Sequence, residues 1–296
     1  MTGIYVNDEG NWKLPKSVWV NQLGTWRVCK NVYVNKSGAW KELIKTVDIT
    51  SNQSNFNLYH HLGSPEQAIS VIVNIGFDVT ISSDGPTLPQ WCPYYCTTTR
   101  VNLPKRPTAF TVGNFPSGST IIINNNGYIS GGGGYGGAGG ASPAKGPSYN
   151  SQVSGTAGGA GGDGIVKGSS NNYDCTIVNT GTIASGGGGG GGACARYFTS
   201  SNIYWTTSGW TQGGQGGDGG GITGYSRTQG GPSSANKGID SNGVDGGNGG
   251  NIGEDGFAGQ AGQSYGAVNG VGGQAGKAVG SDIELAVSGT IIGTIG

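Results

Sequence analysis

The chain has 296 residues, of which 64 are glycine, and only 11% of its residues are charged. This much glycine excludes an ordinary apolar core over half the chain. The formal net charge is zero, so the chain does not have the excess of basic residues that is typical of nucleic-acid-binding proteins. No apolar run is long enough to cross a membrane and the N-terminus has no signal segment, so we expect synthesis in a cytoplasm.

Residues 1–46 contain three copies of a short motif, each fourteen residues after the last. Each copy runs from an apolar–aromatic–apolar stretch through Asn-x-x-Gly to a Trp-cation pair, which predicts a small β-hairpin with a type I turn. Hairpins of this size cannot bury three tryptophans unaided. The tryptophans therefore either form a mini-core or present three equivalent faces to a partner with threefold symmetry. The aromatic residues that would make this attachment are Tyr5, Trp12, Trp19, Trp26, Tyr33 and Trp40.

Residues 47–130 predict a β-strand domain, because β-branched residues alternate along several stretches. These stretches are 47–50, 69–75, 77–81, 109–112 and 120–124. A proline-rich segment at 83–108 predicts a long loop insert, which either contributes to binding or covers the sheet. The only histidines, His60 and His61, are adjacent and would point to opposite sides of a strand. With no acid–base pattern around them, we expect neither catalysis nor metal binding there.

The five cysteines are an odd number, so at least one is free or pairs between chains. Cys92 and Cys96 bracket a three-residue loop that a disulfide would close, and this alternative stays open. Zinc would need a second ligand pair, and none lies near. Free thiols are the expectation for a protein made in a cytoplasm.

Residues 131–296 hold glycine tracts with a period of three. In some tracts the non-glycine residues fall at every third position, and from Gly247 onward glycine does. A period of three matches the polyproline II helix, and glycine-rich helices packed side by side can bond backbone to backbone. We therefore predict a bundle of polyproline II helices. A flexible linker is the alternative, but aromatic and β-branched segments bracket each tract, and collagen would need more proline.

A second repeat leads into the glycine. Residues 121–131, 176–186 and 285–293 each predict a strand, a turn at Asn-Gly or Ser-Gly, and a short strand. Stacked at fixed spacing, these units would anchor one end of the bundle. The predicted fold class is therefore mostly β plus polyproline II: a three-hairpin repeat, a β region, and a glycine-rich bundle with short strands at its base.

Aromatic and basic residues gather in the segments between tracts. If successive tracts run out and back, the segments at 141–154 and 194–212 both lie at the far end. Tyr, Trp, Arg, Ser and Asn on a rigid frame resemble the composition of a binding loop; hydrophobic capping of the tract ends is the alternative. The predicted receptor-binding residues are Lys145, Tyr149, Arg196, Tyr197, Phe198, Tyr204, Trp205, Trp210, Tyr225, Arg227, Phe257 and Tyr265.

The sequence AFTVGNFPSGSTIIINNNGYISGGGG, which begins at Ala109, resembles a segment common in glycine-rich bacteriophage tail-tip proteins. Residues 109–296 are similar in plan to the distal tail-fibre adhesins of T-even-like phages. The resemblance implies a polyproline II sandwich on a virion. Its distal loops would contact an outer-membrane protein such as a porin, or a surface glycan, and its N-terminal part would attach to the tip of a trimeric tail fibre. Residues 47–108 depart from that plan as an extra β region.

Two rival functions remain beside the adhesin. An ice-binding protein would also use polyproline II helices, but has little use for exposed aromatic residues and leaves the tryptophan repeats unexplained. A structural tail-tip protein would tolerate loss of the aromatic loops. An enzyme is not expected, since no paired carboxylates, nucleophile–base pair, metal ligands or cofactor-binding motif stand out.

Overall fold

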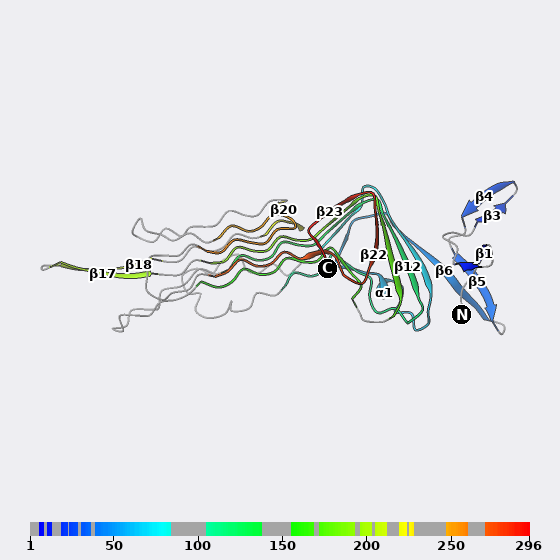
Figure 1. Cartoon of the computed structure of the whole chain (residues 1–296), viewed down its shortest axis with the longest axis horizontal. Helices are drawn as coiled ribbons and strands as arrows, with labels where there is room; N and C mark the ends of the chain where they lie inside the picture. Colours follow the sequence, from blue (N-terminus) through cyan, green and yellow to red (C-terminus); the bar gives the residue numbers. More distant parts are fainter. Residues whose placement is uncertain are drawn as a thin grey trace.

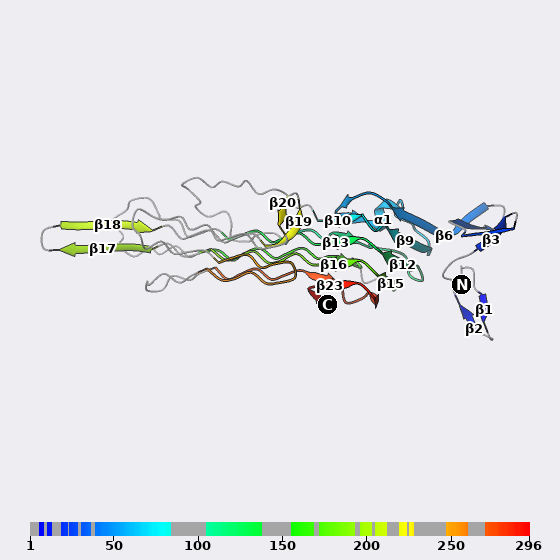
Figure 2. The same ribbon diagram turned by 90° about the horizontal axis from the view of Figure 1, so that it is seen from above.

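The computed structural model is an elongated molecule, with the glycine tracts drawn out toward one end and the N-terminal hairpins at the other (Figures 1 and 2). Side chains are described at residues 21, 24, 25, 44–83, 105–137, 155–168, 172–192, 219–220, 247–259 and 270–296. Within the described residues, no helix is long and apolar enough to cross a membrane. The structure describes the backbone of residues 6–8, 11–13, 19–22, 24–28, 31–36, 39–83, 105–137, 155–168, 172–192, 196–202, 205–211, 219–223, 225–227, 247–259 and 270–296.

Three parallel β-sheets form the middle of the molecule, and the chain visits them in turn to make a three-sided solenoid. One sheet, the end sheet, faces away from the glycine tracts, while the upper and lower sheets converge toward them (Figure 1). The end sheet contains β6 (Ala39–Ile49), β9 (Ser70–Ile75), β12 (Thr120–Asn125), β15 (Asp174–Asn179) and β22 (Glu284–Val287). The upper sheet contains β7 (Gln53–Ser54), β10 (Thr80–Ser82), β13 (Tyr128–Ser130), β16 (Thr182–Ala184) and β23 (Thr290–Ile292). The lower sheet contains β8 (Phe56–Asn57), β11 (Phe110–Thr111), β14 (Ile165–Val166), β21 (Lys277–Val279) and β24 (Thr294–Ile295).

Each coil of the solenoid contributes one strand to each sheet, and equivalent residues of successive coils stack in register. Ile123 of β12, for example, pairs with Val73 of β9 on one side and Ile177 of β15 on the other. All three side chains are fully buried. The β-branched residues at every second position thus fill the interior, and this mostly-β architecture confirms the corresponding part of the predicted fold class.

The solenoid interior also holds satisfied polar and aromatic groups. The buried Asn125 amide donates to the side-chain oxygen of Asn179 at 2.7 Å, and the Asn179 amide donates in turn to the Gly181 and Thr290 carbonyls, so both buried side chains are satisfied. Phe115 packs against Tyr173 at 5.8 Å between ring centroids, and the Tyr173 hydroxyl donates to the Gly113 carbonyl at 2.6 Å. Burial raises the pKa of Tyr173 well above its usual value. These groups are structural in character.

His60 and His61 lie on a helical turn, α1 (Leu58–His61), rather than on a strand. The turn forms because the Asn57 side chain accepts a hydrogen bond from the His60 N–H at 3.1 Å and caps it. The ring of His61 packs 5.2 Å from that of Phe56. Among the residues whose side chains are described, no group of His, Cys, Asp and Glu could hold a metal ion.

The strand predicted at 77–81 is wrong at its start, because β10 begins at Thr80. The Val79 N–H donates to the Gly76 carbonyl at 3.1 Å and closes a turn, which leaves Phe77 83% exposed. Apolar residues alternate with other residues without a break through this turn, so nothing in the sequence indicated that the strand is interrupted there.

All long departures from the solenoid leave from the corner between the upper and lower sheets. In the first and last coils this corner is crossed by single residues, Asn55 and Gly293, which take positive φ angles of 49° and 112°. In the three coils between, the chain leaves the corner and returns after residues 83–109, 131–164 and 185–276. The segment at 83–108, predicted as an insert in a separate β domain, therefore occupies the same place in its coil as the glycine tracts do in theirs.

The glycine tracts form a bundle, in which six segments surround a central segment at 185–192. The N–H groups of Gly186, Gly187 and Gly188 donate to three different neighbours, and their carbonyl groups accept from three others. The outer segments also bond to one another, so they close a ring. In order around it they are 155–164, 131–137, 219–220, 247–253, 254–259 and 270–276.

The bonding partners in the bundle repeat every third residue. Gly189 bonds to the same two outer segments as Gly186, and Gly191 to the same two as Gly188. A threefold helix such as polyproline II requires this repeat, although the polyproline II conformation itself remains a prediction. A Cβ atom on any of residues 186–191 would lie 1.8–2.2 Å from a backbone oxygen, so each of these six positions must be glycine.

The N-terminal repeats pair as antiparallel hairpins: β1 (Val6–Asp8) with β2 (Asn11–Lys13), β3 (Trp19–Gln22) with β4 (Thr25–Val28), and β5 (Asn31–Lys36) with β6. In the second copy, the Gly24 N–H donates to the Asn21 side chain at 2.9 Å, and Gly24 takes a positive φ. The Asn-x-x-Gly spacing thus positions a side-chain acceptor for the turn.

Strands connect the two sides of both predicted domain boundaries. β6 runs unbroken through the boundary at 46 and 47, because its first half pairs with β5 and its second half with β9. Strands on either side of the boundary at 130 and 131 share every solenoid sheet, as β12 pairs with β15. Neither the β region nor the bundle is a separate domain, since each glycine tract begins and ends at a solenoid strand.

Candidate functional site

The far end of the molecule carries a β-hairpin, made of β17 (Arg196–Asn202) and β18 (Trp205–Thr211). It projects beyond the glycine bundle at the end opposite the solenoid (Figure 2). Its register places Tyr197 directly across from Trp210, and Asn202 across from Trp205. The structure thus brings together five predicted receptor-binding residues on one two-stranded element. These are Arg196, Tyr197, Phe198, Trp205 and Trp210.

Sequence reasoning treated 194–212 as an irregular loop and missed both strands. The signal was present, because threonine and aromatic residues are frequent on either side of a short connection at 203–204, and such residues favour strands. Their strand propensity was hidden by glycine tracts on both sides.

Tyr225 and Arg227, also predicted to bind the receptor, lie away from the far-end hairpin, and their role in binding stays a prediction. They belong to β20 (Tyr225–Arg227), which pairs with β19 (Gly221–Thr223). This hairpin lies at the solenoid end of the bundle, away from β17 and β18 (Figures 1 and 2). Residues 219–220, which lead directly into β19, lie near the solenoid end of the bundle, where the Gly220 N–H donates to the Gly250 carbonyl. This bond fixes where the hairpin begins.

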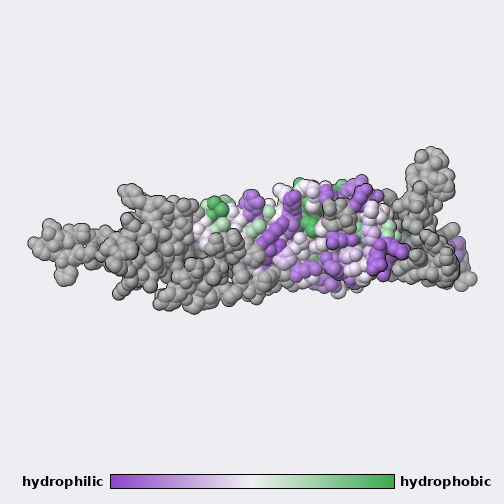
Figure 3. All heavy atoms as spheres, turned by 90° about the horizontal axis from the view of Figure 1, so that it is seen from below, coloured by the Kyte–Doolittle hydropathy of each residue, from purple (hydrophilic) through white to green (hydrophobic). Residues whose placement is uncertain are grey.

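Phe257 is described on the outer surface of the bundle, where 62% of it is exposed. Its carbonyl accepts from the Gly191 N–H, so it lies at the outer end of the described central segment. Val271, which sequence reasoning missed, is 64% exposed on the adjacent outer segment. Exposed hydrophobic surface is otherwise scarce on the face drawn in Figure 3, where polar residues gather over the solenoid. The predicted residues Lys145, Tyr149, Tyr204 and Tyr265 lie outside the described residues.

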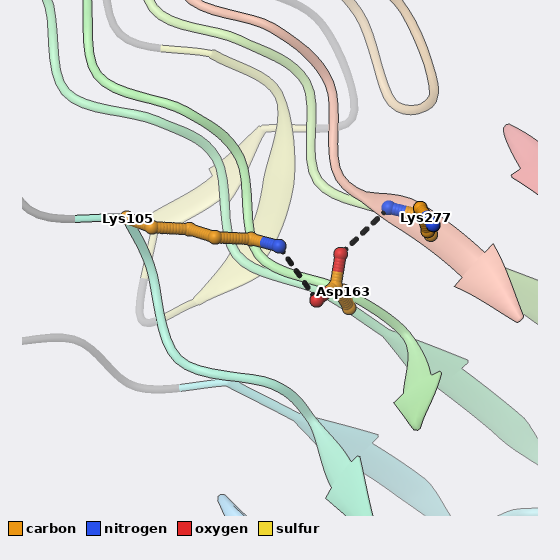
Figure 4. A network of polar contacts seen from close by, with 3 residues as sticks. All are labelled: Lys105, Asp163 and Lys277. Atoms are coloured by element: carbon orange, nitrogen blue, oxygen red, sulfur yellow. Dashed lines mark hydrogen bonds and ion pairs between the residues drawn. The ribbon is translucent and has the colours of Figure 1, made fainter. Parts of the chain in front are cut away.

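Polar contacts fix the base of the bundle to the solenoid (Figure 4). Asp163, only 8% exposed, accepts from the Lys105 ammonium and from the Lys277 backbone N–H, each at 2.7 Å. One buried carboxylate thereby joins three segments that leave or re-enter the solenoid. The Lys105 side chain is half exposed, so the charge pair itself stabilises weakly and the buried N–H bond matters more.

A second contact at the base involves Arg106 and Tyr135. The Arg106 guanidinium lies 3.8 Å from the centre of the Tyr135 ring, and its Nε donates to the Gly133 carbonyl at 2.8 Å. Tyr135, one of the non-glycine residues at the period of three, is buried. The segment at 105–109 thus covers this side of the bundle. A cation over an aromatic face contributes about 1 kcal/mol where it is partly shielded.

The predicted attachment residues are distributed over the N-terminal hairpins in a repeated register. Trp12 pairs with Asn7, Trp26 with Asn21 and Trp40 with Asn35, so the three copies hold tryptophan at the same place. Trp19 begins β3 and Tyr33 lies within β5, while Tyr5 is outside the described residues.

The described ionisable groups with shifted pKa values are buried in the solenoid rather than placed at either end. Burial raises the pKa of the Cys175 thiol to about 12, and the nearby Lys167 charge offsets only part of this. Burial also raises the pKa of Tyr128. Cys175 is a free thiol, as expected. Cys29, Cys92, Cys96 and Cys194 lie outside the residues whose side chains are described, so a Cys92–Cys96 disulfide remains a hypothesis.

Comparison with known proteins finds a similar solved structure and a matching family. A solved structure, the gp37–gp38 adhesin tip complex of the bacteriophage S16 long tail fibre, contains a chain similar to this one. The two are 24% identical, with a TM-score of 0.46, over 86% of this chain and 83% of that one. Among curated protein sequences, none matches. Residues 44–296 match the family described as "Phage tail fibre adhesin Gp38". Because this match covers most of the sequence, the chain belongs to the phage tail fibre adhesin family.

Proposed function

We propose that this chain is the receptor-binding adhesin at the tip of a phage tail fibre, and that β17 and β18 dock onto the outer surface of a bacterium. The observation that carries the proposal is the position of this aromatic hairpin at the far end of a bundle bonded through its backbone. A rigid frame loses little entropy when its end makes contact, so the aromatic residues can act as anchors.

The proposed target is an outer-membrane protein of the porin type or a surface glycan. Both present the mixture of apolar and polar groups that Tyr and Trp recognise. We propose no chemical step on the target: the function needs reversible docking only. At the other end, the three tryptophan hairpins would attach the chain to its fibre. This proposed partner is a trimeric fibre tip, because three equivalent hairpins suit a threefold partner.

The test is binding of the fluorescently labelled chain to a panel of Gram-negative cells, with and without their major porins. Changing Trp205 and Trp210 together to Ala should lower the fraction of bound cells by more than about tenfold, since aromatic anchors contribute about 2 kcal/mol or more each. Binding lost with one porin would identify a protein receptor, and binding lost with truncated surface glycan would identify a sugar.

The matched control changes Tyr225 and Arg227 together to Ala on the hairpin at the base. This variant also removes an aromatic residue from a two-stranded element, but at the wrong end. Equal loss of binding in both variants would contradict docking through β17 and β18. If the chain binds to none of the cells, a structural tail-tip role is favoured. Thermal hysteresis in the same sample would favour ice binding.

A further inference from the structure

The outward face of the end sheet, on β6, β9, β12, β15 and β22, is a flat surface at the end of the solenoid opposite the glycine bundle (Figure 1). Its middle row consists of Thr46, Ile72, Ile122, Thr176 and Glu284, which stack from coil to coil. Ile72 and Ile122 are half-buried and point outward, because their neighbours along each strand are the fully buried inward residues. Two aliphatic side chains therefore lie side by side at the centre of the face.

Five polar side chains of this face are bonded to one another. The Asn124 amide donates to Asn74 at 2.8 Å, and the Asn74 amide donates to Asp48 at 2.9 Å. In the middle row, the Thr176 hydroxyl donates to the Glu284 carboxylate at 3.0 Å. Side chains held in this way lose little freedom on contact, so the face is pre-organised for a rigid partner.

Charge on the face has one sign. Three exposed carboxylates, those of Asp48, Asp174 and Glu284, lie on its first and last two coils, around the aliphatic centre. At the described outward positions of these strands there is no lysine or arginine. A partner that matches this face would present apolar side chains surrounded by basic ones.

The family match points to the partner. It begins at residue 44, within β6, and therefore includes the end sheet while β1 to β5 precede it. A tail fibre adhesin must be held by its fibre, and a surface shared by the family for that purpose would lie in the matched residues. The end sheet also contains β5, so this face is continuous with the third tryptophan hairpin.

We infer that the outward face of the end sheet is a docking surface for the end of the tail-fibre protein, which would meet it with apolar residues ringed by lysine and arginine. This inference rests on the proposed function and adds a second contact beside the tryptophan hairpins. Ile72, Ile122 and the three carboxylates are its determinants.

The experiment co-expresses the full chain with the distal part of the tail-fibre protein of the same phage and measures the chain retained on captured fibre. Ile122→Lys should lower retention by more than about tenfold, because it places a long charged side chain at the interface centre. The control is Thr182→Lys, a half-buried outward position on the upper sheet of the same solenoid, which should leave retention unchanged. Asp174→Lys with Glu284→Lys, at exposed positions that tolerate substitution, should also weaken retention, with Asp78→Lys as the control away from the face.

Cell binding by each variant without fibre separates the outcomes. Variants that still bind cells but leave the fibre support the inference. Full retention of both Ile122→Lys and the double charge reversal would overturn it. Deletion of residues 1–28 measures the share of the first two hairpins: if that deletion alone releases the chain, the hairpins are the whole attachment. A wild-type chain that binds cells but is never retained by fibre would overturn the fibre attachment in the proposed function as well.

Discussion

The solenoid and the glycine bundle are built from the same operation, in which one extended segment is laid beside the next and bonded through its backbone. They differ in what fills the interior. In the solenoid, Ile123 and its stacked neighbours bury side chains. In the bundle, the interior at 186–191 is backbone alone. The hydrophobic effect therefore stabilises one half of the molecule, and hydrogen bonds with close backbone packing stabilise the other.

This difference sets how each region tolerates substitution. An apolar interior can shift slightly around a smaller or larger side chain. A backbone interior cannot, because every atom near the central segment belongs to a main chain that is itself bonded on several sides. The bundle should therefore respond to a single added methyl group more strongly than the solenoid responds to the loss of several.

The largest effect is expected for Gly188→Ala. Its Cβ would lie 1.8 Å from the Gly273 oxygen, so the segment at 270–276 would have to separate from the centre. We expect a loss of more than about 4 kcal/mol, which would unfold the bundle. Limited proteolysis should show cleavage within 131–164 and 185–276 while the solenoid remains resistant.

Gly280→Ala is the matched control, since its Cβ would meet nothing closer than 3.5 Å and the residue has no positive φ. It should leave both proteolysis and thermal unfolding unchanged. A stable, protease-resistant Gly188→Ala protein would mean that the bundle interior is not close-packed, and the comparison with the solenoid would fail.

Ile123→Ala should have the next largest effect and should act on the solenoid. Removing a fully buried aliphatic side chain costs about 2–5 kcal/mol. Urea unfolding should show this loss, and partial relaxation should leave the chain folded in water. Ile72→Ala, at a half-buried outward position, should lower the free energy of unfolding by less than Ile123→Ala does. Equal losses in the two variants would show that the buried interior is not what stabilises the coil.

The smallest effect concerns pH. Burial raises the pKa of Cys175 to about 12 from 9.0, so the folded state keeps the thiol neutral while the unfolded chain ionises it. The stability that depends on the neutral thiol is present in full below pH 9 and is lost as the pH rises toward 12. Urea unfolding between pH 8 and 10.5 should therefore show a steeper decline for the wild type than for Cys175→Ala.

The same thiol gives an independent readout. Mass spectrometry after brief alkylation at pH 8.5 should find Cys175 unmodified in the folded chain and modified after unfolding, because the buried thiol is neutral and only 4% exposed. Ready alkylation in the folded chain would contradict the packing of β15 against its neighbours.

Much of this architecture could be predicted because periodicity reports what surrounds each residue. Alternation at 121–125 indicated a strand with one buried side, and a period of three indicated packed threefold segments. One further signal went unused. The uninterrupted run of glycine at 186–192 marks the segment enclosed on all sides, whereas outer segments need glycine only where they face inward, as at Gly158 and Gly161.

What could not be predicted was the spatial relation between tracts. Counting tracts as out-and-back correctly places residues 196–211 at the far end, but it does not specify which tracts are neighbours or where a short hairpin such as β19 and β20 lies. Those relations depend on bonds between segments far apart in the sequence, such as the bond from Gly276 to Gly186 and that from Gly134 to Gly187. Local pattern holds no information about such pairs.

The shared corner of the solenoid has a consequence for how such proteins change hosts. Three coils open at the corner between the upper and lower sheets, and each closes again in register with the coil before it. Recombination between related phages at these junctions would exchange whole recognition segments and leave the scaffold intact. Adhesins of this kind could then acquire new host ranges in single genetic events, and an engineer could graft segments at the same junctions to redirect a phage.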